Sequence, residues 1–237
     1  MAGRAIIFGA SGGIGAALVD MLEERGWDVA AGARGSVVRQ GQRAISFRFD
    51  LLDESSLAAA AVQFADYQPD LLIVATGVLT LSDGTGPERS LRKLDPTAML
   101  EVLRLNSVGP ALIAKHFLPL LPPDRRSVFA ALSARVGSIG DNRLGGWHSY
   151  RASKAALNML LRNFAIEMAG THPKVVIAGL HPGTVATNLS GPFQGNVPRQ
   201  QLLSPEESAA HLLDVIDGLT PADSGGVFDW RGDRLPD

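Results

Sequence analysis

The chain has 237 residues, a length typical of one large domain or two small ones. It contains no cysteine, which excludes disulfides, zinc–thiolate sites and a cysteine nucleophile. A formal net charge of -2 gives no general attraction to nucleic acid or to an anionic membrane. The apolar runs are shorter than a membrane span, and the first residues lack the pattern of a signal peptide. We therefore expect a cytoplasmic protein that contacts neither nucleic acid nor membrane.

Short apolar runs alternate with segments of helical periodicity along most of the chain. The runs of strand length cover residues 4–9, 28–33, 44–49, 70–76, 127–132, 174–179 and 226–230. Helical periodicity is found over residues 13–26, 54–65, 96–119, 149–169 and 204–216, and the last of these opens with a capping box. Strands that are apolar throughout are typical of a parallel sheet covered on both faces. The alternation predicts a doubly wound, Rossmann-type α/β sandwich of three layers, with a mostly parallel sheet of about seven strands.

Neither an internal repeat nor a linker rich in Pro, Gly or Ser divides the sequence. We therefore expect residues 1–237 to form a single domain. The one irregular stretch, residues 190–202, contains glycine, proline and Phe193, and we expect it to be a mobile loop.

Three glycines lie between the first strand and the first helix. Gly9, Gly13 and Gly15 have the spacing G-x-x-x-G-x-G, close to the dinucleotide fingerprint. A turn without Cβ atoms lets the backbone approach a pyrophosphate, whose charge then meets the amides of a helix N-terminus. A tight turn with no ligand is the alternative, but the position of the loop favours a phosphate site. We expect Ser11 and Ile14 to bind the dinucleotide together with the three glycines.

The end of the second strand indicates which dinucleotide binds. An acidic residue there usually contacts a free ribose 2′-hydroxyl, but residues 29–49 contain four arginines and no Asp or Glu. Because a guanidinium can form two parallel hydrogen bonds to a phosphate, this composition favours NADP(H), with Arg34 as the 2′-phosphate ligand. The other arginines, Arg39, Arg43 and Arg48, are interpreted as a solvated face.

Tyr150 and Lys154 lie four residues apart near the start of a long helical segment, so they share one helix face. Reduction of a ketone needs a proton for the developing alkoxide, and a free phenol has a pKa near ~10. A neighbouring ammonium favours the phenolate and moves that pKa toward the working pH. The spacing alone arises often by chance, so its meaning depends on the other motifs.

Together, the glycine loop, the Tyr–Lys pair after the fifth strand and the chain length resemble the short-chain dehydrogenase/reductase family. Residues 133–158 are most similar to the branch of C-factor-type and sniffer-type carbonyl reductases. The resemblance implies hydride transfer between NADP(H), or NAD(H), and a carbonyl or alcohol. It makes Tyr150 the general acid/base, Lys154 the group that lowers its pKa and binds the nicotinamide ribose, and Asn106 the anchor of a water relay. A redox sensor or signalling protein with little turnover is the alternative, although the intact Tyr–Lys–Asn set argues against it.

The resemblance also assigns residues to the rest of the cofactor. Asp50 would lie beside the adenine, and residues 182–187 under the nicotinamide. The family's N-N-A-G stretch is replaced by residues 74–77, which keep a glycine and small residues but neither asparagine. The cofactor contacts implied by these segments are Asp50, Leu51, Ala75, Thr76, Gly77, Pro182, Gly183, Val185 and Thr187.

The serine that should orient the substrate oxygen has two possible registers. The family generally has two serines at the end of the fifth strand, the second being catalytic. Counting forward along the strand puts Ser133 in that place, whereas counting back from Gly137 puts Ala134 there. Ser138 is a further hydroxyl nearby. We favour Ser133.

The remaining features concern metals, substrate and subunits. The five histidines show no metal-ligand spacing, so we expect no metal site. Trp147 and Phe193 either wall an apolar pocket for a small-molecule substrate or are ordinary core aromatics. The helical segments 96–119 and 149–169 have apolar faces of the kind that relatives use to pair subunits, and we expect a homodimer or homotetramer.

Overall fold

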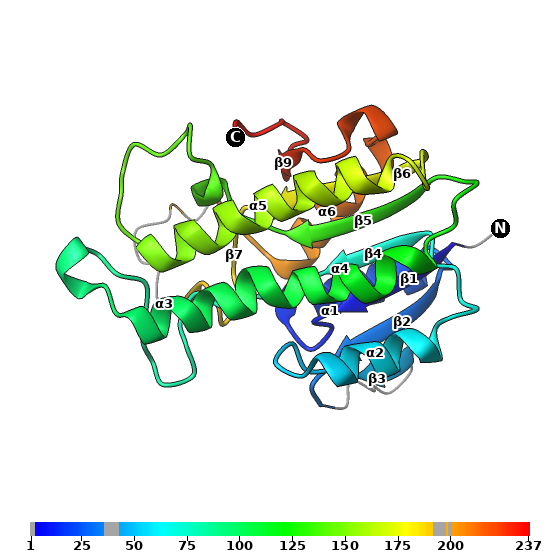
Figure 1. Ribbon diagram of the computed structural model, residues 1–237, viewed down its shortest axis with the longest axis horizontal. Helices are drawn as coiled ribbons and strands as arrows, with labels where there is room; N and C mark the ends of the chain where they lie inside the picture. Colours follow the sequence, from blue (N-terminus) through cyan, green and yellow to red (C-terminus); the bar gives the residue numbers. More distant parts are fainter. Residues whose placement is uncertain (1–2, 36–42, 192–197, 199–200) are drawn as a thin grey trace.

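A seven-stranded sheet occupies the centre of the computed structural model, which describes residues 3–35, 43–191, 198 and 201–237 (Figure 1). The strand order is β3-β2-β1-β4-β5-β6-β9, and every neighbouring pair is parallel. The strands are β1 (Arg4–Phe8), β2 (Asp28–Ala33), β3 (Ile45–Arg48), β4 (Leu71–Val74), β5 (Ser127–Leu132), β6 (Val175–His181) and β9 (Val227–Asp229). The predicted fold class is confirmed.

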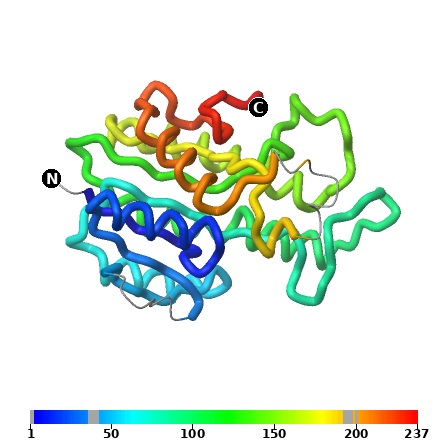
Figure 2. The backbone as a smooth tube through the Cα atoms, turned by 180° about the vertical axis from the view of Figure 1, so that it is seen from behind, coloured from blue at the N-terminus to red at the C-terminus, as the bar shows by residue number. Residues whose placement is uncertain are grey.

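Helices cover both faces of the sheet, as the two opposite views show (Figures 1 and 2). One face packs against α1 (Gly13–Glu24) and α6 (Pro205–Gly218). The other packs against α2 (Glu54–Gln63), α4 (Gly109–Phe117) and α5 (His148–Met168). Because strand side chains alternate between faces, β5 sends Val128, Ala130 and Leu132 to the first apolar core and Phe129 and Ala131 to the second.

The predicted helix over residues 96–119 is interrupted. It consists of α3 (Pro96–Leu103), a π-helical turn η2 (Arg104–Val108), α4 and a short 3-10 turn, η3 (Leu118–Leu120). A π-helical turn accommodates one more residue than an α-helical turn, and such turns are frequent at functional sites. Apolar periodicity continues through the interruption, so the sequence pattern did not reveal it.

The C-terminal half of the chain contains the predicted capping box and a small second sheet. Ser204 Oγ accepts a hydrogen bond from the Glu207 amide at 3.0 Å, and Glu207 Oε2 accepts one from the Ser204 amide at 2.7 Å, which confirms the predicted start of α6. Residues Thr184–Val185 (β7) and Leu202–Leu203 (β8) form a two-stranded parallel sheet that was not predicted. Most of the predicted mobile loop, including Phe193, lies outside the described residues, as does Arg39.

Candidate active site

The carboxyl ends of the parallel strands meet along one edge of the sheet, and the predicted site residues follow them. The strand order reverses between β1 and β4, since β2 and β3 continue on one side and β5, β6 and β9 on the other. In open α/β sheets, ligands bind in the crevice at such a reversal. Gly9 follows β1, Ala75 follows β4, Ser133 follows β5 and Pro182 follows β6. The fold therefore gathers four segments at one edge of the sheet.

The glycine loop is tightly folded against the start of α1. Gly9 has a φ of +89°, and the amides of Gly9 and Ala10 both donate to the Gly32 carbonyl, at 2.9 and 3.0 Å. A Cβ atom on Gly15 would lie 2.2 Å from the Gly9 carbonyl oxygen, so this position requires glycine. Within the described part of the chain, no side chain caps α1, and its first turn contains no acidic residue. The N-terminus of α1 is therefore open to an anion.

The end of β4 and the segment after β6 approach the same loop. A Cβ atom on Gly9 would lie 2.9 Å from the Ala75 carbonyl group, and one on Gly13 would lie 2.9 Å from Thr187 Cγ2. Thr76 Oγ1 is buried and has no hydrogen-bond partner among the described residues. A buried hydroxyl without a partner costs free energy unless a ligand or water satisfies it. These residues fit a dinucleotide that passes between β1 and β4.

Two further predicted cofactor contacts lie at the ends of β2 and β3. Arg34 follows β2 directly, and its side chain is exposed. Asp50 lies just beyond β3, and its Oδ1 accepts a hydrogen bond from the Leu52 amide at 2.9 Å. The Asp50 amide in turn donates to Ser56 Oγ at 2.8 Å, which fixes the turn between β3 and α2.

Tyr150 and Lys154 lie in the first two turns of α5, and burial dominates their electrostatics. Lys154 Nζ donates to the Leu132 carbonyl at 2.8 Å and lies 5.8 Å from the centroid of the Tyr150 ring. Burial lowers the pKa of Lys154 to about 8 and raises the pKa of Tyr150 to about 12. The shift of the Tyr150 pKa is therefore opposite to the expected lowering, and burial of the phenol is its cause.

Asn106 lies in the π-helical turn and is fully buried. Its Oδ1 accepts from the Val78 amide at 2.8 Å, and its Nδ2 donates to the Val78 carbonyl at 2.9 Å and to Ser153 Oγ at 3.1 Å. A Cβ atom on Gly77 would lie 3.2 Å from Asn106 Oδ1 and 3.5 Å from Lys154 Nζ. The asparagine therefore joins the end of β4 to the helix that carries the Tyr–Lys pair.

The two candidate serines both have partners. Ser133 Oγ donates to Asn158 Oδ1 at 2.6 Å, and Asn158 lies one helical turn after Lys154 on α5. Ser138 Oγ accepts from the Asp141 amide at 3.0 Å and lies 3.5 Å from the Asp237 carbonyl oxygen. Ala134, which lies between the two serines in the sequence, is buried. Among the described residues, the partners of both hydroxyls are groups other than Tyr150.

Sequence reasoning missed two buried charged groups near this edge. Glu88, in the segment between β4 and α3, accepts hydrogen bonds from the backbone and hydroxyl of Ser149. Asp229 at the end of β9 pairs with Arg135 at 2.9 Å, beside His181. Burial, with a further contribution from Arg135, lowers the pKa of His181 to about 4, so that histidine is neutral. An isolated Glu or Asp in a polar stretch gives no sequence signal for such contacts.

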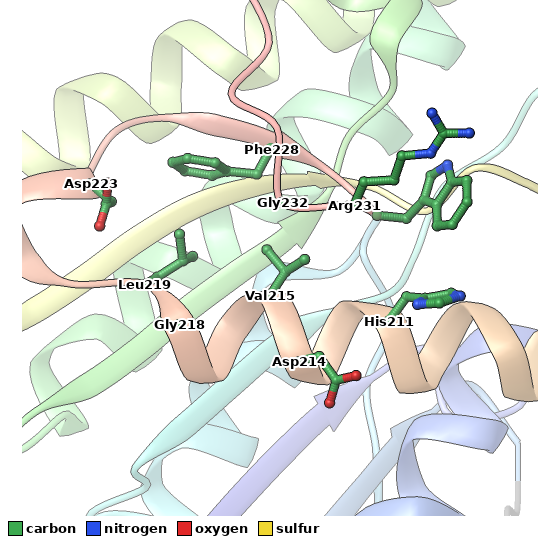
Figure 3. A pocket seen from close by; sticks show the side chains of 10 residues that line it. His211, Asp214, Val215, Gly218, Leu219, Asp223, Phe228, Arg231 and Gly232 are labelled. Carbon is green, nitrogen blue, oxygen red and sulfur yellow. The ribbon is translucent and has the colours of Figure 1, made fainter.

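A cavity of about 550 Å³ lies elsewhere, between α6 and the segment around β9 (Figure 3). His211 and Asp214 extend from α6, while Trp230 and Arg231 follow β9. The lining of this cavity includes neither Tyr150 nor a residue of the glycine loop. In the described ranges, no group of three His, Asp or Glu side chains is placed to hold a metal ion.

None of the helices in the described ranges combines the length and apolar character needed to cross a bilayer.

The parallel sheet, the glycine turn after β1 and the Tyr–Lys pair on α5 define a Rossmann-type oxidoreductase. Residues 4–197 match the family model of the short chain dehydrogenases, and the chain belongs to this family. The family resemblance predicted from the sequence is thereby confirmed.

Three known proteins illustrate the similarity. A 1-hydroxy-2-glutathionyl-2-methyl-3-butene dehydrogenase of Rhodococcus sp. (strain AD45) is 31% identical over 224 residues, which are 93% of each chain. The C-signal of Myxococcus xanthus is 34% identical over 167 residues, covering 70% of this chain and 92% of that protein. The NADPH-bound carbonyl reductase from chicken fatty liver superposes with a TM-score of 0.85 at 25% identity, covering 99% of both chains.

Proposed function

We propose that the protein is an NADP(H)-linked carbonyl reductase or alcohol dehydrogenase, with Tyr150 as the general acid/base and Lys154 as its partner. The observation that carries the proposal is the convergence of Lys154, Asn106 and Gly77 at the carboxyl end of β4, one helical turn from Tyr150. The similarity to a carbonyl reductase whose structure contains NADPH supports the cofactor. This chain is 25% identical to that enzyme over nearly its whole length.

A buried, protonated phenol suits the role of proton donor to a substrate oxygen. When bound, the nicotinamide supplies the hydride that adds to the substrate carbon. Because burial raises the pKa of Tyr150 to about 12, its phenol keeps its proton at neutral pH and donates it when the alkoxide charge develops. The Lys154 ammonium then stabilises the tyrosinate that remains. Its hydrogen bond to the Leu132 carbonyl holds Nζ between α5 and the end of β5.

We propose that each part of the cofactor binds at a different segment of the chain. The pyrophosphate would bind at the glycine loop, the 2′-phosphate at exposed Arg34, the adenine beside the turn after β3, and the nicotinamide half between the ends of β4 and β6. The residues are Gly9, Ser11, Gly13, Ile14, Gly15, Arg34, Asp50, Leu51, Ala75, Thr76, Gly77, Tyr150, Lys154, Pro182, Gly183, Val185 and Thr187.

Ser133 remains our candidate for orienting the substrate oxygen. Its hydroxyl proton is donated to Asn158 Oδ1, so it is not free for a substrate in this arrangement. Rotating the Asn158 amide by half a turn would make Nδ2 the donor and free the Ser133 proton. Comparing the turnover of Ser133→Ala with that of Ser138→Ala decides between the two hydroxyls.

The direct test is a fluorescence titration with NADPH and NADH, followed by turnover on aldehydes, ketones and quinones. Tyr150→Phe keeps the ring that lies edge-on to Trp147 but removes the proton donor, and we expect kcat to fall about 10²–10⁴-fold. Tyr67→Phe is the matched control: it removes the chain's other phenol, which donates to the Asp28 carbonyl at 2.8 Å, and should leave turnover unchanged. Full turnover by Tyr150→Phe would exclude the proton-transfer role.

The similarity to C-signal favours one alternative, a dinucleotide-binding redox sensor or signalling protein. Such a protein would bind NADPH as a reductase does but would turn over no member of the substrate panel.

We further propose a cytoplasmic, single-domain protein that pairs with itself. Leu100 on α3, Val108 at the end of the π-helical turn, and Met159 and Ile166 on α5 are all about half exposed or more. A monomeric mass in light scattering at micromolar concentration would exclude the homo-oligomer.

A further inference from the structure

The helix that carries Tyr150 and Lys154 begins without a cap of its own. Its N-cap residue, Trp147, has left-handed backbone angles and makes no side-chain capping hydrogen bond. Gly145 and Gly146 before it also have positive φ values, of 62° and 66°. The first helical amides of α5 therefore need acceptors from another segment.

Glu88 supplies those acceptors from the segment that joins β4 to α3. Its Oε2 accepts from the Ser149 amide at 3.0 Å, and its Oε1 accepts from the Ser149 hydroxyl. Its own carbonyl accepts from the Trp147 amide. Ser149 is the second residue of α5, so the carboxylate occupies the position in which an N-cap side chain normally binds.

The contact is buried and charged. Glu88 is 9% exposed and Ser149 3% exposed. Burial raises the pKa of Glu88, but the hydrogen bonds from Ser149 and from backbone amides outweigh that effect, and the pKa lies below its usual value. An ionised carboxylate is favoured at a helix N-terminus, where the backbone dipoles leave a partial positive charge.

Tyr150 follows Ser149 directly. Together with Glu88 and Ser149 it lines a small cavity to which residues of the same segment and of α3 also contribute, Leu79 and Val102 among them. Arg151, the next residue of α5, donates to the Gly146 carbonyl at 3.0 Å and to the Val136 carbonyl at 3.3 Å. The first turn of α5 is thus held both by Glu88 and by the contacts of Arg151.

We propose that Glu88 is a positioning residue for the reaction, and that its carboxylate fixes the first turn of α5 so that the Tyr150 hydroxyl faces the substrate oxygen. The proposal rests on the proposed function, since it assigns Glu88 an effect on Tyr150. Displacing a catalytic group by about 1 Å can cost roughly 10²-fold in rate. A residue outside the sheet and outside α5 would therefore set the rate of proton transfer.

The test compares Glu88→Ala with Glu88→Gln, whose amide oxygen can still accept from Ser149. We expect Glu88→Ala to lower kcat about 10–100-fold while KM and the Kd for NADPH change less than about threefold. Glu88→Gln should recover kcat to within about threefold of the wild type. Hydrogen exchange of the Ser149 amide should be faster in Glu88→Ala than in the wild type and in Glu88→Gln.

Asp223→Ala is the matched control. Asp223 accepts hydrogen bonds from the amide and hydroxyl of Thr220 at 2.9 and 2.7 Å, the same pair of contacts that Glu88 makes with Ser149. It lies in the turn between α6 and β9, so its loss should lower Tm without lowering kcat. A Glu88→Ala kcat within twofold of the wild type would overturn the proposal. An equal loss of kcat in Asp223→Ala would do the same.

Two further outcomes are distinguishable. If Glu88→Ala does not fold, Ser149→Ala removes only the hydroxyl donor, and we expect kcat to fall about 3–10-fold; an unchanged kcat overturns the proposal. A wild-type protein that reduces no carbonyl contradicts the proposed function. In that case hydrogen exchange at Ser149 still decides whether Glu88 fixes the start of α5.

Discussion

Substitution of Gly15 by alanine sets two physical effects against each other. Alanine favours the interior of a helix over glycine by about 1 kcal/mol, so helix propensity alone predicts that Gly15→Ala stabilises the protein. The added Cβ, however, would lie 2.2 Å from the Gly9 carbonyl oxygen, 2.8 Å from the Gly9 carbonyl carbon and 3.2 Å from Ala10 Cα. All three atoms belong to the backbone, so no side-chain rotation relieves the contact.

The glycine loop is poorly able to move away. The amides of Gly9 and Ala10 are hydrogen-bonded to Gly32, and the Gly12 amide donates to the Gly9 carbonyl at 3.0 Å. Overpacking costs about 1–3 kcal/mol, and a contact of 2.2 Å with a backbone atom places this case in the upper part of that range, about 2–3 kcal/mol, which exceeds the gain in propensity. We expect Gly15→Ala to lower the free energy of unfolding by about 1–2 kcal/mol net, and Tm by about 2–4 °C for each kcal/mol.

Urea denaturation followed by circular dichroism measures this change, and an NADPH titration by fluorescence measures the accompanying loss of affinity. Gly12→Ala is the control for stability, because a Cβ at Gly12 meets no atom closer than 3.4 Å and its φ of -81° suits alanine. We expect its free energy of unfolding to stay within about 0.5 kcal/mol of the wild type. If Gly15→Ala is more stable than the wild type, the steric argument for this loop is wrong.

Three other predictions concern buried or exposed charges. Burial moves the pKa of Lys154 from 10.5 to about 8. Between these two pH values the unfolded chain binds more protons than the folded protein. The free energy of unfolding should therefore rise with pH through that window in the wild type but not in Lys154→Met. Below pH 8 that variant should be more stable by up to roughly 3 kcal/mol in urea denaturation, and inactive. Arg135→Met leaves Asp229, whose side chain is 5% exposed, without its cation. Because the Arg135 side chain is 49% exposed, we expect the free energy of unfolding to fall by only about 1–2 kcal/mol, and an unchanged urea midpoint would contradict this expectation. Arg34→Glu should weaken NADPH binding about 10–100-fold and leave NADH binding equal or stronger; equal weakening of both would remove the 2′-phosphate assignment.

The sequence predicted what depends on local pattern. Apolar runs and glycine positions located the strands and the loop after β1, because both follow from periodicity and backbone geometry. The four-residue spacing placed Tyr150 and Lys154 on one helix face. These features need no knowledge of contacts between distant segments.

Contacts between distant segments were not predictable in this way. Glu88 and Ser149 lie 61 positions apart, and Arg135 and Asp229 lie 94 apart, with no local motif at either end. The pKa of Tyr150 depends on burial of its ring, which the spacing to Lys154 does not reveal. Ser133 was placed at the end of β5 correctly, but its partner Asn158 became evident only when the helix was packed against the strand.

The π-helical turn at Arg104–Val108 limits how the length of the chain can change during evolution. Each residue added to or removed from a helix rotates the part before it by about 100° and shifts it by about 1.5 Å. Deleting one residue from this turn would restore a regular helix but rotate α3 away from α5, against which it packs. It would also turn Asn106 away from Val78. A change of length between residues 104 and 117 is therefore expected to disrupt both the packing of α3 on α5 and the contacts of Asn106.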